Sequence, residues 1–184
     1  MKYTKISSAC REIVKYLIGV CKDSLHKNIV TYENDGDGRA LFVGLSPLTY
    51  MTHLDVEDAN YPNIWVIACC YDWYGCVHND PYMEFVEAGE DEYVASLYRH
   101  DTFDNVFVPP AVAIDPAGKI SVVSAEEQRN TAFYVELALL DIDNRFNVIF
   151  TKNMNIPLPV SDPFGKAGER YPIPQLFSTQ NNSR

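Results

Sequence analysis

The run Ile64-Trp65-Val66-Ile67-Ala68-Cys69-Cys70-Tyr71 decides the fold. It is almost continuously apolar, and it follows the turn-forming residues Tyr61-Pro62-Asn63. A short apolar run with such a boundary is typical of a strand that is buried on both faces. Because a buried strand needs strands on either side of it and a layer that covers the sheet, we looked for these elements in the rest of the chain.

Several short segments around this run are predicted to form strands. They are Ile29 to Glu33, Ala40 to Leu45, Tyr82 to Val86, Tyr93 to Tyr98, Ala111 to Ile114, Lys119 to Val123 and Arg145 to Thr151. The first two flank an Asn/Asp/Gly-rich stretch, and Ala111 to Ile114 and Lys119 to Val123 flank Asp115-Pro116-Ala117-Gly118, so each pair predicts a hairpin. Pro109 and Pro110, which directly precede Ala111, exclude a central strand at their own positions.

Two segments carry helical patterns. From Thr4 to Lys27 the apolar residues recur at three- and four-residue spacing, with Ser7 or Thr4 as the N-cap. These apolar residues are Ile6, Cys10, Ile13, Val14, Leu17, Cys21 and Leu25, and Arg11, Lys15 and Lys22 share a neighbouring face. The second helix is predicted to start at a capping box of Ser124 and Glu127. Its apolar stripe is Phe133, Leu137 and Leu140. It is expected to run to about Ile142, and Asn144 can end it in a left-handed conformation.

These elements predict an α+β fold: a mostly antiparallel sheet on which both helices pack. Residues 1–155 are expected to form one domain. Residues 156–184 hold five prolines between Pro157 and Pro174 and are expected to form an extended C-terminal arm. Its apolar side chains could dock onto the subunit's own core or onto a neighbouring subunit, and we expect the neighbour. They are Leu158, Val160, Phe164, Tyr171, Ile173, Leu176 and Phe177.

The 184-residue chain has a net charge of −10 that is unevenly distributed along it. Residues 1–32 hold six Lys or Arg and two Asp or Glu, residues 33–104 hold two and fifteen, and residues 105–184 hold seven and eight. This balance argues against a general binder of nucleic acid or of anionic membranes. We expect the acidic middle segment to meet a cationic protein surface. Its candidate contact residues are Asp80, Glu84, Glu87, Glu90, Asp91 and Glu92.

Cysteine usage and the N-terminal segment bear on the compartment. The five cysteines are an odd number in a chain of ordinary domain size, which indicates reduced thiols and not a disulfide framework. The first 27 residues carry six Lys or Arg among the apolar positions, so no export signal is predicted. We expect a soluble cytoplasmic protein, or a virion component if the source is viral.

Two patterns raise the possibility of a metal site. Glu33-x-Asp35-x-Asp37-Gly38 resembles the first half of an EF-hand loop, but Gly44 occupies the position of the bidentate Glu, so an acidic turn is the better interpretation. Cys69, Cys70, Cys76 and His78 are zinc-ligand types, but Cys69 and Cys70 are adjacent on a strand and should point to opposite faces. No metal and no other cofactor is expected.

No catalytic residue is predicted either. Cys70 with His78, His53 or His100 would be the best nucleophile and base, but the acidic surroundings would raise the pKa of the thiol. His100 is expected to be a simple surface residue. The aromatic residues of the Trp65 to Tyr74 segment could line a ligand pocket, and core packing is the alternative.

The order of the elements resembles that of the small α+β subunits that close the neck or tail of tailed bacteriophages. The resemblance rests on the opening helix to Lys27, on the start of the strand at Tyr61 to Ile67, and on the helix from Ser124 to Ile142 that leads into Phe146 to Phe150. It implies a ring-forming structural subunit without catalysis.

Three functions remain open from the sequence. The first is a non-catalytic, homo-oligomeric assembly protein of the virion type, in which the basic end of one subunit meets the acidic part of the next. The second is an acidic inhibitor or nucleic-acid mimic that blocks a basic site on a host enzyme. The third is an enzyme of unrecognised type that uses Cys70 and His78.

Overall fold

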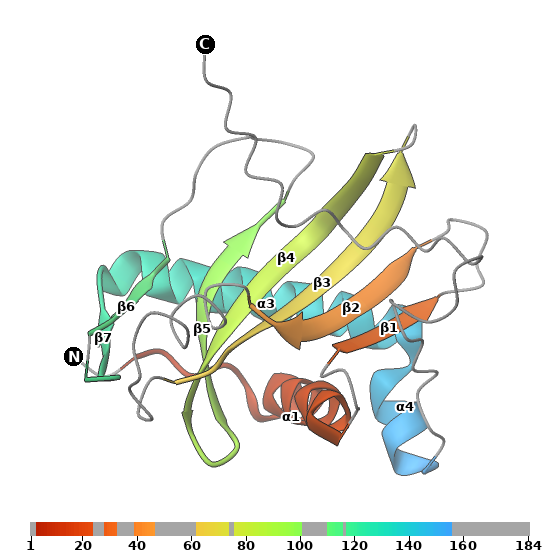
Figure 1. Ribbon diagram of the computed structural model, residues 1–184, viewed down its shortest axis with the longest axis horizontal. Helices are drawn as coiled ribbons and strands as arrows, with labels where there is room; N and C mark the ends of the chain where they lie inside the picture. The colour runs from red at the N-terminus through yellow and green to blue at the C-terminus, as the bar shows by residue number, and fades with distance from the viewer. Residues whose placement is uncertain are drawn as a thin grey trace.

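The computed structural model describes residues 3–23, 28–32, 39–46, 62–73, 76–100, 110–115 and 117–155. Within them, five antiparallel strands form one sheet in the order β1-β2-β3-β4-β5 (Figure 1). The strands are β1 (Asn28–Tyr32), β2 (Ala40–Leu45), β3 (Ile64–Trp73), β4 (Cys76–Gly89) and β5 (Glu92–Arg99). Each strand pairs with the one before it in the chain, so the sheet is a simple meander. The predicted α+β class is confirmed.

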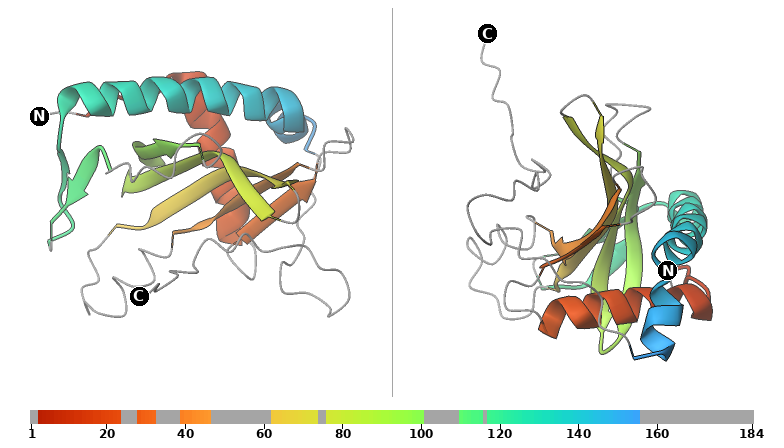
Figure 2. Two further views of the ribbon diagram at one scale, coloured as in Figure 1. Left: turned by 90° about the horizontal axis from the view of Figure 1, so that it is seen from above. Right: turned by 90° about the vertical axis from the view of Figure 1, so that its right-hand side faces the viewer.

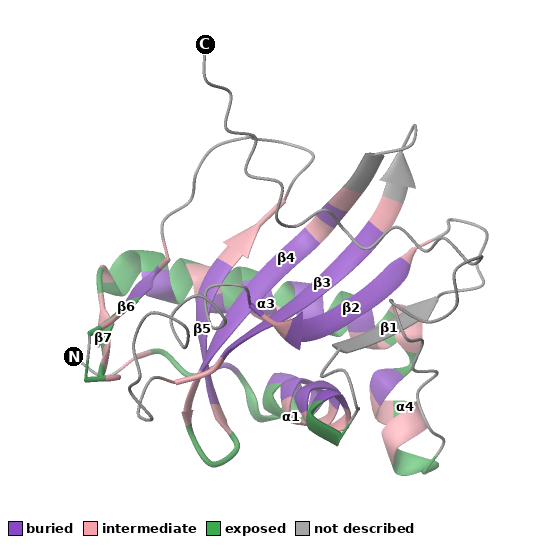
Figure 3. Ribbon diagram, in the orientation of Figure 1, coloured by how far each residue is buried: buried purple, intermediate pink, exposed green. Residues whose placement is uncertain are grey.

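Strand β3 lies at the centre of the sheet, as predicted. Every residue from Ile64 to Cys70 is buried, and Figure 3 shows the buried stretch crossing the middle of the sheet. Trp65 and Ile67 face the helices, whereas Val66 and Ala68 belong to a separate apolar cluster on the opposite face. The continuous apolar run therefore has the expected cause, because both faces of this strand are covered.

Helices α1 (Ser8–Asp23) and α3 (Ala125–Phe146) pack on one face of the sheet and share a single core with it (Figure 2). Ser7 caps α1, because its Oγ accepts a hydrogen bond from Cys10 N at 3.4 Å. The predicted apolar face of α1 is confirmed from Cys10 to Cys21. Leu25 lies outside the described residues.

Helix α3 starts where the sequence predicts but buries a different face. Ser124 is its N-cap, with Oγ accepting from Glu127 N at 3.3 Å. The predicted stripe of Phe133, Leu137 and Leu140 is wrong as a core face, since these side chains are 57%, 52% and 46% exposed. The buried residues of α3 are Gln128, Ala132, Val135, Ala138, Leu139 and Ile142. Both faces show three- and four-residue spacing, so spacing alone could not distinguish them.

The buried polar residue of α3 explains how its first turns are held. The Gln128 amide pairs with the backbone of Thr4: Thr4 N donates to Oε1 at 2.6 Å, and Nε2 donates to Thr4 O at 3.2 Å. The segment before α1 is thereby tied to α3, and Gln128 is satisfied in the core. The small side chains of Ala132 and Ala138 let the helix lie close to the sheet.

The predicted strand from Arg145 to Thr151 is wrong. Helix α3 continues past Asn144 to Phe146, Asn147 adopts the left-handed conformation (φ 50°, ψ 42°), and helix α4 (Val148–Asn153) follows. Asp143 stabilises the turn by accepting from Ile149 N at 2.7 Å. Alternate apolar residues suggested a strand, but Val148 is buried in the core and Phe150 is 59% exposed, as their positions on a short helix dictate.

The second predicted hairpin is confirmed as β6 (Val112–Ile114) and β7 (Ile120–Val122). Asp115 organises its turn, since Oδ1 accepts from Ala117 N and Lys119 N, both at 2.9 Å. The predicted arm at 156–184, with the seven apolar side chains named above, lies outside the described residues. So does the acidic turn Glu33 to Gly38. Among the described residues no helix is long and apolar enough to span a membrane.

Candidate functional site

The outward-facing side of α3 exposes a stripe of large apolar side chains. Phe133, Leu137 and Leu140 recur at four- and three-residue spacing, and we call these three residues the α3 outer stripe. Figure 3 shows the exposed surface along this helix. Single exposed apolar residues are common, but a contiguous row of them on one helix face marks an interaction surface. The α3 outer stripe is therefore the first candidate functional site.

Aromatic contacts fix one edge of this stripe. Tyr134, 49% exposed, stacks on Tyr98 of β5 with ring centroids 5.5 Å apart, and it meets Phe133 edge to face at the same centroid distance. The stacked pair anchors the helix to the sheet beside the stripe. The first turn of α3 holds Glu126 and Glu127, whereas Arg145 in the last turn pairs with Asp141 of the same helix at 2.6 Å.

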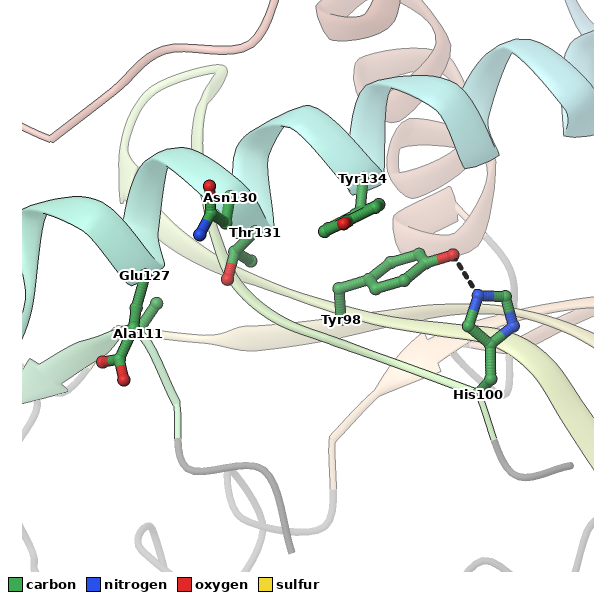
Figure 4. Close-up of a pocket in the computed structure, with 7 residues that line it drawn as sticks. All are labelled: Tyr98, His100, Ala111, Glu127, Asn130, Thr131 and Tyr134. Atoms are coloured by element: carbon green, nitrogen blue, oxygen red, sulfur yellow. Dashed lines mark hydrogen bonds between the residues drawn. The ribbon is translucent and has the colours of Figure 1, made fainter. Parts of the chain in front are cut away.

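A pocket of about 360 Å³ lies between α3 and the end of β5. It is the second candidate site. Figure 4 shows Glu127, Thr131 and Tyr134 projecting from the helix towards Tyr98 and Ala111. Asn130 and His100 complete the lining. Pockets of this kind, mostly apolar with a few polar groups, are typical small-molecule sites.

His100 lies at one end of this pocket; its side chain is 37% exposed, so it is a surface residue as expected, but it also has two side-chain partners. Its Nδ1 contacts the Asp80 carboxylate, and its Nε2 contacts the Tyr98 hydroxyl. The Tyr98 ring also meets the imidazole edge to face at 5.0 Å. Burial raises the pKa of Tyr98, and the neighbouring Tyr134 raises it further. The phenol therefore stays protonated at neutral pH, and Asp80 orients the imidazole.

The predicted acidic contact residues are mostly engaged within the subunit. Glu87 of β4 accepts from Lys22 Nζ at 2.5 Å, and its other oxygen accepts from Trp65 Nε1 and Asn63 Nδ2, both at 3.0 Å. Burial raises the pKa of Glu87, but these hydrogen bonds outweigh it, so the pKa lies below its ordinary value. Glu87 is a structural anchor for α1 and not a free surface charge.

The remaining acidic residues have different surroundings. Asp91 pairs with Lys15 at 3.2 Å, and Glu92 pairs with Lys5 at 2.5 Å. Glu84 is buried, and burial raises its pKa although Tyr82 Oη donates to it at 2.8 Å. Glu90 is exposed. The six residues therefore do not form one uniform acidic face.

These ion pairs change the meaning of the charge distribution along the sequence. The basic N-terminal segment lies against the acidic β4–β5 region of its own subunit, through Lys5, Lys15 and Lys22. The expectation that one subunit's basic end meets the acidic part of the next loses its electrostatic basis here, because the nearest acids already have internal partners.

The cysteine and histidine pair is not assembled. Cys70 is buried and its Sγ lies 3.1 Å from Asn79 Oδ1, whereas His78 pairs in register with Tyr71 and stacks on it at 5.6 Å. Because neighbouring residues of a strand alternate between faces, Cys70 and His78 face opposite sides of the sheet. No group of His, Cys, Asp and Glu that could hold a metal occurs among the described residues. His53 and the Cys76 side chain lie outside them.

The described aromatic residues of the β3 segment serve the core and its edge. Trp65 is 2% exposed and binds Glu87, and Tyr71 stacks on His78 and lies beneath Arg39 at 5.7 Å. The core interpretation of Trp65 is thus confirmed. The side chains of Trp73 and Tyr74 lie outside the described residues.

No protein-family model matches the chain, and neither a curated protein nor a solved structure matches it. Helical spacing singles out the residues of the α3 outer stripe but predicts them to be in the core. The pocket has no signal in the sequence, because Tyr98, Ala111 and Glu127 come together only when α3 lies across the end of β5.

Proposed function

We propose that the protein is a non-catalytic assembly protein, a structural subunit that packs against a second copy of itself through the α3 outer stripe. The observation that carries this proposal is the exposure of Phe133, Leu137 and Leu140 in one row on a rigid helix whose opposite face is fully committed to the core. A helix with two apolar faces needs two packing partners, and the described residues of the subunit supply only one.

The helix dipole favours a second copy in an antiparallel arrangement as the occupant, because the dipoles of two antiparallel α3 helices oppose each other favourably. Side-chain charge does not set this arrangement, since Arg145 at the end of α3 already pairs with Asp141 of the same helix at 2.6 Å. The antiparallel arrangement produces a closed, two-fold interface in which each stripe contacts its equivalent. This two-fold arrangement replaces the head-to-tail one expected from the sequence.

The other two functions have less support. An inhibitor that mimics nucleic acid needs free carboxylates in a regular array, but Glu87, Asp91 and Glu92 are paired with lysines of their own subunit. An enzyme built on Cys70 and His78 needs the two side chains together, and they face opposite sides of the sheet. The phage tail-completion type remains a proposal that rests on the order of elements.

The test is the mass of the purified full chain in solution, measured by sedimentation equilibrium. In a symmetric pair, Phe133→Ser with Leu137→Ser removes two half-exposed apolar side chains from each copy, at about 1 kcal/mol per side chain. The pair should therefore weaken by about 4 kcal/mol, or about a thousand-fold in dissociation constant. Phe150→Ser, an equally exposed apolar residue on α4, is the matched control and should leave association unchanged. Equal effects of the two variants would contradict the proposal.

A further inference from the structure

We infer that the pocket between α3 and β5 is a binding site for a small organic cation with an aromatic body. This inference goes beyond the assembly function and rests on different residues. The pocket uses the side of α3 that faces β5, whereas the α3 outer stripe points away from the sheet. Tyr134 borders both surfaces.

The walls of the pocket favour an aromatic ligand. At one end, Tyr98 and Tyr134 stack at 5.5 Å with an angle of 18° between their rings, so both side chains are held in place. Tyr98 is further fixed by His100, which Asp80 orients in turn. Such a chain of contacts from three elements gives a preorganised wall, which lowers the entropic cost of binding. Aromatic rings bind on and beside such walls.

The polar groups of the pocket favour a cation. Among the described residues that line the pocket, Glu127 is the one carboxylate and neither Lys nor Arg occurs. Figure 4 shows its carboxylate directed towards Ala111, at the opposite end from the imidazole of His100. Asn130 and Thr131 lie between the two ends, and Figure 4 shows the Thr131 hydroxyl, which can accept a hydrogen bond, directed away from the helix. An anionic ligand would meet repulsion at the Glu127 end, whereas an ammonium group would gain a charge-assisted hydrogen bond.

The volume limits the size of the ligand. At about 360 Å³ the pocket is at the lower end of the range for small-molecule sites. It therefore suits a molecule with one or two rings and excludes a dinucleotide or a folded partner. Glu127 and Tyr134 are about two turns apart on α3. A ligand that contacts both therefore needs a linker between its ring and its ammonium group.

The experiment uses two probes with the same aromatic body and opposite charge, phenethylamine and phenylacetate. Both are titrated into the full-length protein labelled with nitrogen-15, and amide shifts are followed by NMR. We expect phenethylamine to bind at least about ten-fold more tightly than phenylacetate, since a hydrogen bond to a charged group is worth that factor or more. The shifts should centre on Tyr98, Thr131 and Tyr134 and leave Phe150 of α4 unmoved.

Two variants locate the source of the preference. Glu127→Gln should bring the two affinities to within about two-fold, because it removes the charge and keeps the shape. Glu90→Gln removes one negative charge from the exposed β4–β5 turn and should leave the ten-fold preference intact. Equal binding of the two probes to the unaltered protein would overturn the inference. So would absence of shifts in the pocket, or an equal loss of preference in both variants.

Discussion

The contacts of Glu87 predict a graded series of stabilities. Its two oxygens accept from Lys22 of α1, from Trp65 of β3 and from Asn63, so one carboxylate joins the first helix to the sheet. Glu87→Gln keeps an acceptor for Trp65 and Asn63 but loses the ion pair with Lys22. Because the Lys22 side chain is 39% exposed, solvent screens this ion pair, and we expect Glu87→Gln to lower the free energy of unfolding by only about 1 kcal/mol. Glu87→Ala also leaves the Trp65 indole N–H without a partner, which adds about 1–3 kcal/mol.

The same contacts predict a pH dependence. The pKa of Glu87 is lower in the folded protein than in the unfolded chain. Its contribution to stability is therefore complete above the pKa of the unfolded chain, near 4.5, and is lost as the pH falls through the lowered folded pKa. The difference in unfolding free energy between the unaltered protein and Glu87→Gln should be largest at pH 7 and should shrink below about pH 4.5.

Urea unfolding at pH 7 and at pH 3.5 measures both predictions. Glu90→Gln is the matched control, since Glu90 is exposed and forms no ion pair with a described residue; its cost should stay below about 0.5 kcal/mol. The expected order of cost at pH 7 is Glu90→Gln, then Glu87→Gln, then Glu87→Ala. The reasoning is refuted if Glu87→Ala costs no more than Glu90→Gln, or if the cost of Glu87→Gln is the same at both pH values.

Four further substitutions test the packing of α3 and the buried carboxylate. At protein concentrations low enough for the single-copy form, Leu139→Ala should cost about 2–5 kcal/mol of unfolding free energy in urea and Leu140→Ala less than about 0.5 kcal/mol, because only Leu139 is in the core of the subunit; similar costs would mean that the helix is oriented differently. Ser124→Ala should lower stability by about 1 kcal/mol through loss of the N-cap, seen as a lower thermal midpoint, and an unchanged midpoint would contradict this. Burial raises the pKa of Glu84 above its value in the unfolded chain, so the contribution of Glu84 to the free energy of unfolding should decline as the pH rises from about 4.5 through the folded pKa. Glu84→Gln should abolish that decline. A decline that persists in Glu84→Gln would argue against Glu84 as its source.

Much of the fold follows from local sequence patterns. The apolar run from Ile64 marks the central strand because both of its faces are covered, and the Asp115 turn marks its hairpin because turn chemistry is local. Ser124 marks the start of α3 for the same reason. These features depend on neighbours within a few residues, so the sequence alone contains them.

The candidate sites could be predicted only in part, because they depend on tertiary placement. Phe133 and Val135 both fit helical spacing, and only the position of the sheet decides which one is buried. The pair of Lys22 and Glu87 joins residues 65 positions apart, so segment charges could not reveal that the basic helix neutralises acids of its own subunit. The pocket likewise depends on how α3 crosses β5.

The central claim is that the α3 outer stripe holds two copies of the chain together. The most direct measurement is sedimentation equilibrium of the full chain, with mass followed against protein concentration. We predict a reversible conversion from one copy to two, no larger species, and loss of the two-copy form in Phe133→Ser with Leu137→Ser but not in Phe150→Ser. A single copy at every concentration up to the millimolar range would contradict the claim, as would a two-copy form that persists in the double variant.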